Sequence, residues 1–379
     1  MTASGERFLV TGALGCIGAW TVRGLVRDGA QVVALDVGSD PRRLRLIMTD
    51  EELAAVTFVT GDITDLASVE GVLDSHAITN VIHLAALQVP FCRADPERGA
   101  RVNVHGTVVV FEAVLDGNGI TNVIHLAALQ VPFCRADPPR GALVNVVGTV
   151  NIFEAVRRRA DAMAPVVYTS SMAVYTADDA DPVTGRLMVD AVPHPPNHYG
   201  VYKQANEGNA RIYWLDTGLS SVGVRPMTVY GVGRDQGMTS GPTKAIVAAV
   251  LGQPYRVSFS GPTMYQYAPD VARTLIAASR TTVEGAHVFN LPGEVADGRA
   301  LTAAIEAAVP GAGGHIEFEP GDLPFPSEID HDGIETVDPA PATPLAMGVA
   351  ETVDVLQALA RDGRLDPADH GMEPVAASN

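Results

Sequence analysis

The stretch RFLVTGALGCIGAWTVRGLVRDGAQVVALD, residues 7–36, predicts a strand, a glycine turn, a helix and a second strand. Its apolar runs FLV and VVAL are typical of parallel strands that are buried on both faces. Between them Gly12, Gly15 and Gly18 mark the turn, and apolar residues then recur near helical spacing. We therefore expect an α/β fold built on a doubly wound parallel sheet.

The glycine turn also predicts a dinucleotide site. The three glycines would give a tight turn, a close approach of the backbone to a pyrophosphate, and close packing of helix on strand. The pyrophosphate would lie at the helix N-terminus, where free N–H groups and the helix dipole favour negative charge. Asp36 ends the second strand, where a carboxylate binds ribose hydroxyls and repels the 2′-phosphate of NADP. We therefore predict that the cofactor is NAD. The nearby Arg42 and Arg43 are the residues that argue for NADP instead.

A third strand is expected in VTFVTGDITD, residues 56–65, and it ends at Asp62. Its carboxylate could accept a hydrogen bond from the adenine amino group. The alternative is an aspartate that only caps the next helix.

The composition excludes several classes of partner. The 379 residues carry 26 basic and 44 acidic side chains, a net charge of −18, which repels a polyanion. No apolar run reaches the roughly 18–20 residues of a membrane span, and the N-terminus does not resemble a secretory signal. Cys16, Cys92 and Cys134 are few and unclustered, as in reduced cytoplasmic proteins. The ten histidines lack metal-ligand spacing, so we expect no metal site. From the charge and the lack of a membrane span we expect no nucleic-acid or membrane partner.

Catalytic groups are expected at the end of a later strand. PVVYTSSMAVY, residues 165–175, is a buried strand with hydroxyls at its carboxyl end, where ligands bind in open α/β sheets. Downstream, Tyr199 and Lys203 stand four apart on one helix face. An ammonium one turn away stabilises a phenolate and lowers the pKa of the phenol. A serine hydroxyl can hold the substrate oxygen while the phenol exchanges its proton.

With these residues the chain resembles the extended short-chain dehydrogenase/reductase family, also called the NAD-dependent epimerase/dehydratase family, over roughly residues 6–360. The segments that carry the resemblance, besides Asp36, are GALGCIG (12–18), GDITD (61–65), VIHLAA, NVVGT (145–149), TSSMAVY (169–175), YGVYK (199–203), RPMTVYG (225–231) and YQYAPDVA (265–272).

The resemblance implies a Rossmann-type domain at 1–230, an interleaved substrate-binding lobe at 231–360 and a frayed tail at 361–379. It implies that Ser171, Tyr199 and Lys203 are catalytic, and that the protein is a homodimer. Lys203 would bind the nicotinamide ribose and lower the pKa of Tyr199. The implied NAD-binding residues are Gly12, Gly15, Cys16, Ile17, Gly18, Asp36, Asp62, Ile63, Leu126, Ala127, Ala128, Asn145, Tyr199, Lys203 and Pro226.

Departures from the family pattern narrow the expected chemistry. Met172 and Ala173 stand where family dehydratases carry an acidic pair, which argues against dehydration. Thr228 replaces an Asn of the nucleotide-sugar enzymes, and Thr263 aligns with their phosphate-binding Arg. A hydroxyl is a poor replacement for a bidentate Arg–phosphate contact, so a smaller sugar is favoured over a nucleotide sugar.

We therefore predict an NAD-dependent oxidoreductase that moves a hydride between nicotinamide and a secondary alcohol or ketone of a sugar, sugar acid or polyol. One alternative is an NAD-dependent sugar or nucleotide-sugar epimerase. The other is a catalytically silent NAD-binding protein whose site has been broken by an internal duplication.

That duplication is plain in the sequence. ITNVIHLAALQVPFCRADP occurs at 78–96 and again at 120–138, and residues 78–119 match 120–161 at 32 of 42 positions. Two units are too few for a solenoid, so the pattern favours unequal recombination within one gene; an error in assembling the sequence is the alternative. By the resemblance, NVIHLAAL is the fourth parallel strand and has one place in the sheet.

Three arrangements of the two copies are open. As neighbouring strands, they would move the Ser171 strand about 4.8 Å away from the cofactor strand, and a 1 Å error can cost on the order of 10²-fold in rate. Extruding one copy costs only roughly 3.3 kcal/mol in loop closure, but exposing its Val, Ile and two Leu costs about 1.5–3 kcal/mol each. The third arrangement is an exchange between protomers.

We predict that 120–161 fills the single place and that 78–119 lies outside the sheet. The second copy runs directly into the Ser171 strand, and its helix keeps an amphipathic face. If the first copy filled the place, Leu84, Ala85 and Ala86 would replace their twins at the cofactor.

Overall fold

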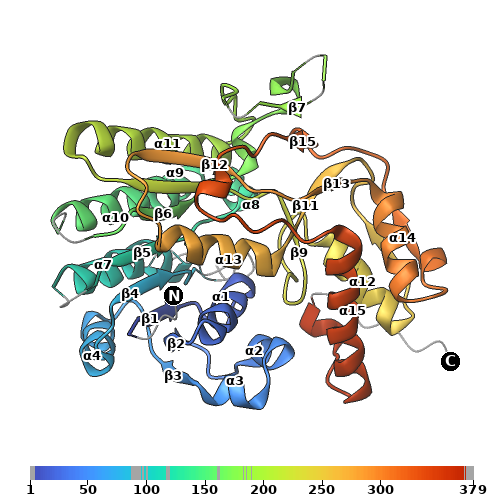
Figure 1. Cartoon of the computed structure of the whole chain (residues 1–379), viewed down its shortest axis with the longest axis horizontal. Helices are drawn as coiled ribbons and strands as arrows, with labels where there is room; N and C mark the ends of the chain where they lie inside the picture. The colour runs from blue at the N-terminus through green and yellow to red at the C-terminus, as the bar shows by residue number, and fades with distance from the viewer. Residues whose placement is uncertain are drawn as a thin grey trace.

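An eight-stranded parallel sheet forms the centre of the molecule (Figure 1). The computed structural model describes residues 5–86, 95, 98–99, 101–116, 120–159, 163–181, 183–184, 186–188, 190–370 and 372. The strand order is β12-β8-β6-β5-β4-β1-β2-β3, which confirms the predicted doubly wound α/β fold. The strands are β1 (Arg7–Thr11), β2 (Gln31–Asp36), β3 (Val56–Thr60), β4 (Asn80–His83), β5 (Asn122–His125), β6 (Val166–Thr169), β8 (Ser221–Arg225) and β12 (Ala286–Asn290).

Helices cover both faces of this sheet because neighbouring strand residues point to opposite sides. Ile82, Ile124 and Val167 join one core, and Val81 and Val123 join the other. The first core packs under α1 (Cys16–Arg27) and α13 (Ala268–Ser279). The second packs under α4 (Leu66–His76), α7 (Thr107–Asp116), α10 (Gly148–Arg157) and α11 (His198–Thr217).

A smaller lobe surrounds a three-stranded sheet of β9 (Thr228–Tyr230), β11 (Thr263–Tyr267) and β13 (Glu294–Ala296). Its core lies against α12 (Gly241–Leu251), α14 (Gly298–Ala308) and α15 (Leu345–Arg361). The chain returns from this lobe to the large sheet through α13 and β12. Residues 371 and 373–379 of the expected tail lie outside the described residues.

The remaining elements are short. They are α2 (Arg42–Ile47), α3 (Asp50–Ala54), α8 (Val131–Ala136), α9 (Pro138–Ala142), β7 (Arg186–Leu187), β10 (Tyr255–Val257), β14 (Ile316–Phe318) and β15 (Glu328–Ile329), with π-helices at Arg101–Gly106 and Leu143–Val147 and 3₁₀ helices at Met172–Val174, Ala177–Asp179, Gly313–His315, Ile334–Thr336 and Pro367–His370. Within the described ranges no helix is both long and apolar enough to cross a membrane.

The prediction that one copy of the repeat lies outside the sheet is wrong. β4 and β5 are neighbours, and each residue pairs with its own twin, from Asn80 with Asn122 to His83 with His125. The side chains of Val81 and Val123 are both buried, as are Ile82 and its twin Ile124. With both copies side by side in the sheet, the apolar residues of both strands are buried. If one copy lay outside the sheet, its apolar residues would be exposed to water.

Each copy keeps only some of the polar contacts that one strand could make. In β4, His83 Nδ1 lies 2.7 Å from the Thr11 hydroxyl of β1, and Nε2 lies 3.1 Å from the Thr107 hydroxyl. Its twin His125 is equally buried and stacks on the His83 ring at 5.7 Å, but neither of its ring nitrogens has a hydrogen-bond partner among the described residues. The second strand lies one position too far from β1 to reach Thr11.

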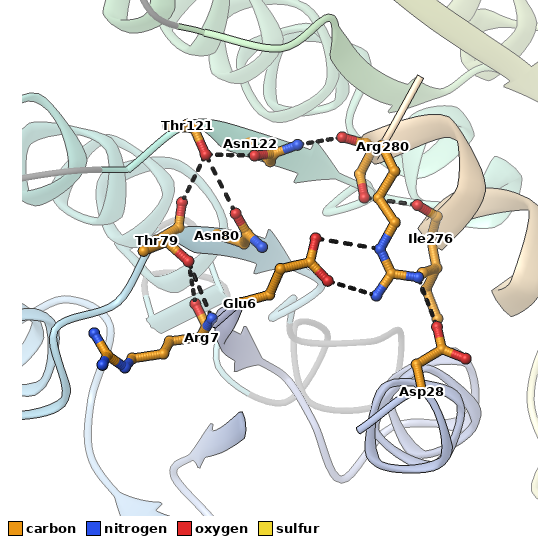
Figure 2. Close-up of polar contacts among 10 residues, drawn as sticks. Glu6, Arg7, Asp28, Thr79, Asn80, Thr121, Asn122, Ile276 and Arg280 are labelled. Carbon is orange, nitrogen blue, oxygen red and sulfur yellow. Dashed lines mark hydrogen bonds and ion pairs between the residues drawn. The ribbon is translucent and has the colours of Figure 1, made fainter. Parts of the chain in front are cut away.

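The opposite end of the strands shows the reverse asymmetry (Figure 2). Asn122 Nδ2 donates to the carbonyl of Ser279 at the end of α13. The twin amide nitrogen of Asn80 is buried without a partner in the described part of the chain. Thr121 bridges the copies, since its backbone N–H donates to Thr79 O at 2.7 Å. The first copy thus holds the contact to β1, and the second holds the contact to α13.

The twin histidines predict opposite mutational effects on stability. His125→Leu removes two unsatisfied buried nitrogens and should raise the free energy of unfolding by about 1–2 kcal/mol. His83→Leu breaks two hydrogen bonds and should lower it by about 1–3 kcal/mol. Urea unfolding of both variants at neutral pH measures the difference. Equal effects of the two substitutions would contradict the assigned contacts.

The same histidines predict acid sensitivity. Burial lowers the pKa of His83 to about 3 and the pKa of His125 well below its usual value. Below the unfolded pKa of about 6.5 the unfolded chain takes up protons that the native state refuses, so stability falls by about 1.4 kcal/mol per pH unit for each histidine. Unfolding measured from pH 7 to 5 should show this slope. His125→Leu should reduce it, whereas a slope unchanged by the substitution would show that carboxylates alone cause it.

Candidate active site

A cavity of about 320 Å³ opens at the carboxyl ends of the central strands. The glycine turn lies on one side, and Ser171 and Tyr199 line the same space. Parts of the smaller lobe complete the lining. Of the predicted site residues, those that line it are Gly12, Gly15, Cys16, Ile17, Gly18, Leu126, Ala128, Ser171, Tyr199 and Pro226.

The glycine turn has the geometry that a pyrophosphate needs. Gly12 has a φ of +67°, and a Cβ there would lie 2.6 Å from the backbone nitrogen of Ala85. Among the described residues, a Cβ on Gly15 would meet only the Gly12 carbonyl, at 3.2 Å, so these residues leave its outer side open. α1 begins at the next residue, and no side chain of the described residues caps its first N–H groups. These groups are therefore available to an anion in the cavity.

Of the two acidic residues predicted for the adenosine half, Asp36 lies beside this turn. One Asp36 oxygen accepts from the Leu14 N–H at 3.2 Å, so the carboxylate is held against the turn. Asp62 is exposed and accepts from the Thr64 N–H, while Asp65 caps α4, which excludes the alternative that Asp62 is that cap. Arg43 is bound to Asp235 at 2.5 Å and to the Leu14 carbonyl.

The helix that carries Tyr199 is fixed close to the Ser171 turn. Asn197 caps the start of α11 by accepting from the Gly200 N–H. A Cβ on Gly200 would clash with the Ala173 carbonyl oxygen, so this close approach requires glycine. The Ser171 hydroxyl accepts from the Ala173 N–H at 3.1 Å and lies close enough to Tyr199 to lower the pKa of its phenol. The two predicted catalytic hydroxyls therefore lie together.

Lys203 lies behind these hydroxyls and is 3% exposed. Its Nζ donates to the Thr169 carbonyl at 2.7 Å and lies 5.6 Å from the centre of the Tyr199 ring. Burial lowers the pKa of Lys203 to about 8, and it raises the pKa of Tyr199 to about 12. The pKa of the phenol is therefore shifted opposite to the direction predicted from Lys203. The Ser171 hydroxyl and the charge of Arg234 oppose that rise in the pKa of Tyr199.

The other predicted contacts lie around the cavity without lining it. Ala127 and Ile63 are buried, and a Cβ on Gly106 of the first copy would touch Ile63. The buried Asn145 side chain bonds the backbone of Leu129 through both its oxygen and its nitrogen. It therefore shapes the loop after β5. Lys203, Asp36 and Asp62 also stand outside the lining.

The two copies of the repeat divide the site between them. Leu84 and Ala86 of the first copy and Leu126 and Ala128 of the second all line the cavity. The first copy contacts the glycine turn at Gly12. The second contacts α11, since Asn206 of that helix donates to the Asn145 carbonyl at 2.7 Å and Tyr202 donates to the Pro138 carbonyl at 2.7 Å.

Sequence reasoning missed Arg234, which follows β9 in a loop over the cavity. Its side chain lines the cavity, and its buried Nε has no hydrogen-bond partner among the described residues. Its charge lowers the pKa of both Cys16 and Tyr199, which line the same cavity. An arginine in GVGRDQG, just after the RPMTVYG segment, was the available signal.

The two threonines that depart from the family pattern satisfy each other. Thr228 of β9 and Thr263 of β11 are fully buried, and their hydroxyls lie 2.8 Å apart. Neither lines the cavity. Their hydroxyls therefore bond each other within the small sheet and do not face the cavity.

Two family models match the chain. Residues 112–291 match the NAD dependent epimerase/dehydratase family, and residues 9–119 match the GDP-mannose 4,6 dehydratase model. The dehydratase match ends where the first copy of the repeat ends. Each model therefore takes up a different copy of the duplicated unit.

Among curated proteins, the UDP-glucose 4-epimerase of Mycolicibacterium smegmatis is 30% identical over 359 residues, which are 92% of this chain and 97% of that one. UDP-glucuronate 4-epimerase 5 of Arabidopsis thaliana is 30% identical over 60% of this chain. The chain spans less than half the length of that plant enzyme, 42%.

Solved structures share the fold. The NAD complex of the UDP-glucose 4-epimerase of Thermus thermophilus superposes with a TM-score of 0.62 at 22% identity, over 93% of this chain and 99% of that one. A partial consensus L-threonine 3-dehydrogenase gives 0.66 at 21% identity, over 93% and 100%.

Because the first copy contacts the glycine turn and the second contacts α11, we can predict the effect of removing one copy. Because residues 78–96 and 120–138 are identical, any 42-residue deletion that joins equivalent points of the two segments gives the same protein. We expect that protein to fold, since one strand can reach both Thr11 and Ser279. It should show equal or higher turnover, because the glycine turn and Ser171 become one strand spacing of about 4.8 Å closer.

Circular dichroism, NAD titration and turnover of the full and shortened chains test this expectation. A shortened chain that does not fold would refute it. Folding with lower turnover would show that the site needs both copies.

Proposed function

The chain belongs to the NAD-dependent epimerase/dehydratase family of extended short-chain dehydrogenases/reductases, and from this we propose that it moves a hydride between NAD and a secondary alcohol or ketone of a sugar-like substrate. The single observation that carries the proposal is one cavity lined by the glycine turn, Ser171 and Tyr199. Asp36 at the turn favours NAD over NADP, and Asp235 holds Arg43 away from a 2′-phosphate role.

We assign a role to each catalytic group. Ser171 would hold the substrate oxygen, and Tyr199 would exchange the proton of that oxygen. NAD, when bound, supplies the hydride acceptor and a positive ring that favours phenolate. Lys203 would contact the nicotinamide ribose. Its pKa of about 8 leaves the ammonium charged at neutral pH, so it adds to the stabilisation of phenolate.

Arg234 favours a sugar acid within the proposed substrate class. A guanidinium without an ion-pair partner in the described chain lines the cavity near Tyr199. Such a group binds a carboxylate through two parallel hydrogen bonds. Thr228 and Thr263 argue against a nucleotide substituent bound at their positions, because their hydroxyls are paired with each other.

Epimerisation is the second candidate, because a relative that matches almost the whole chain is a UDP-glucose 4-epimerase. In that reaction the same Ser171 and Tyr199 would act, and the hydride would return to the substrate. A rise in the absorbance of reduced nicotinamide identifies a dehydrogenase. Product isomers without that rise identify an epimerase.

We also propose a cytoplasmic homodimer. Cys16 and Cys134 are free thiols, as expected in a reducing compartment. Val201, Ile212 and Leu215 are exposed apolar side chains on α11, which suits a helical dimer contact. Light scattering of Leu215→Glu tests the dimer.

The proposed roles predict how turnover responds to two substitutions. With free sugars, sugar acids and nucleotide sugars as the substrate panel, Tyr199→Phe should lower kcat by about 10²–10⁴-fold. Arg234→Gln should raise KM for sugar acids by about 10–100-fold. It should leave KM for neutral sugars unchanged. NAD-coupled absorbance and chromatography of products measure both. Turnover of nucleotide sugars alone would contradict the substrate assignment, and NAD binding without any turnover would favour the silent protein.

A further inference from the structure

Glu207 lies on α11 one turn after Lys203 and two turns after Tyr199, so the three side chains share a helix face. Its carboxylate is 11% exposed. One oxygen accepts from the Ser170 hydroxyl at 2.5 Å and from Arg225 Nε at 2.8 Å. The other accepts from Arg225 Nη2 at 2.7 Å. The carboxylate is thus bound by a bidentate ion pair and a hydroxyl.

These partners precede groups that line the cavity. Ser170 is followed by Ser171 at the end of β6, and Arg225 ends β8 and is followed by Pro226. The Ser170 N–H also donates to Val224 O at 2.7 Å. One carboxylate therefore ties together the segments that carry Ser171, Pro226 and the Tyr199–Lys203 helix face.

Arg225 is itself held rigidly, so the ion pair gives Glu207 a fixed position. Its Nη1 donates to the Asn290 amide oxygen at 3.2 Å, and the guanidinium lies 4.9 Å from the centre of the Tyr175 ring. Asn290 in turn donates to the Asp330 carbonyl at 2.7 Å. Truncating one partner of such a buried pair leaves the other charge uncompensated, which is strongly destabilising.

Glu207 is also the carboxylate whose charge acts on Lys203 in the interior. Within the described residues, the other titratable groups that face Lys203 are Cys134 of α8, His125 of β5 and Tyr199 of its own helix. Of these four, only Glu207 carries a negative charge at neutral pH, since burial raises the pKa of the Cys134 thiol and of the Tyr199 phenol. Its charge therefore favours the ammonium form of Lys203 and opposes the fall in the pKa of that group.

We propose that Glu207 is the positioning residue of this site: its carboxylate sets the spacing of Ser171 and Tyr199 through Ser170 and Arg225 and supplies the counter-charge of Lys203. The inference rests on the proposed NAD-dependent function. It adds a group that touches neither cofactor nor substrate but fixes the groups that do.

The experiment compares Glu207→Gln and Glu207→Asp with Asp338→Asn in the full chain. Asp338 is a matched control, because it is a buried carboxylate paired with Arg273 at 3.0 Å and it does not line the cavity. Both Gln and Asn variants should be destabilised. Only Glu207→Gln should lower kcat, by about 10–100-fold, with KM little changed, and Glu207→Asp should recover part of the loss.

A second readout needs no turnover. The affinity for NAD, titrated from pH 6 to 9, should fall as Lys203 loses its proton. In Glu207→Gln this fall should move to lower pH, and in Asp338→Asn it should stay in place. If NAD binds but the pH profile and kcat respond alike in the two variants, the positioning role is wrong and the proposed function stands. If the profile shifts but no substrate turns over, the positioning role stands and the proposed reaction is wrong. A chain that binds no NAD overturns both.

Discussion

The architecture depends on the pairing of two identical strands in register. Parallel strands buried on both faces need a neighbour at each edge and an apolar cover on each side. β4 and β5 supply this for each other because every residue meets its twin, so apolar residues face apolar residues throughout. The cost falls on the polar ends of the strands, where the described residues leave His125 and Asn80 without the partners that their twins keep. The core thus buries the apolar residues of both copies of the repeat, while some polar atoms of the copies lack partners in the described chain.

The part of the molecule beyond β5 keeps its own contacts beside the extra strand, because those contacts are local. Asn145, Tyr202 and Asn206 bind the second copy to α11, while Gly200 allows that helix to approach the Ser171 turn. Glu207 then fastens the same helix to the ends of β6 and β8. These links would move as one body with the second copy, so Ser171 and Tyr199 remain together whatever separates them from β1.

Much of this was predictable from the sequence. The glycine turn, Asp36, Ser171 and Tyr199 are marked by residue type and spacing, because each occupies a position where few residue types could serve. The placement of the repeat was not predictable, because both copies have the same local preference and only the partners across the sheet distinguish them. Arg234 and the Glu207–Arg225 pair were missed for a related reason: their roles arise from residues that lie far away in the sequence.

The inserted strand also has a geometric effect on the molecule as a whole. Adjacent strands of a sheet are rotated by roughly 20–25° with a fixed hand. An extra strand in the middle therefore turns everything beyond β5, including the smaller lobe, relative to the first three strands. Each flank can keep the shape of its relatives while the two flanks differ from them in mutual orientation.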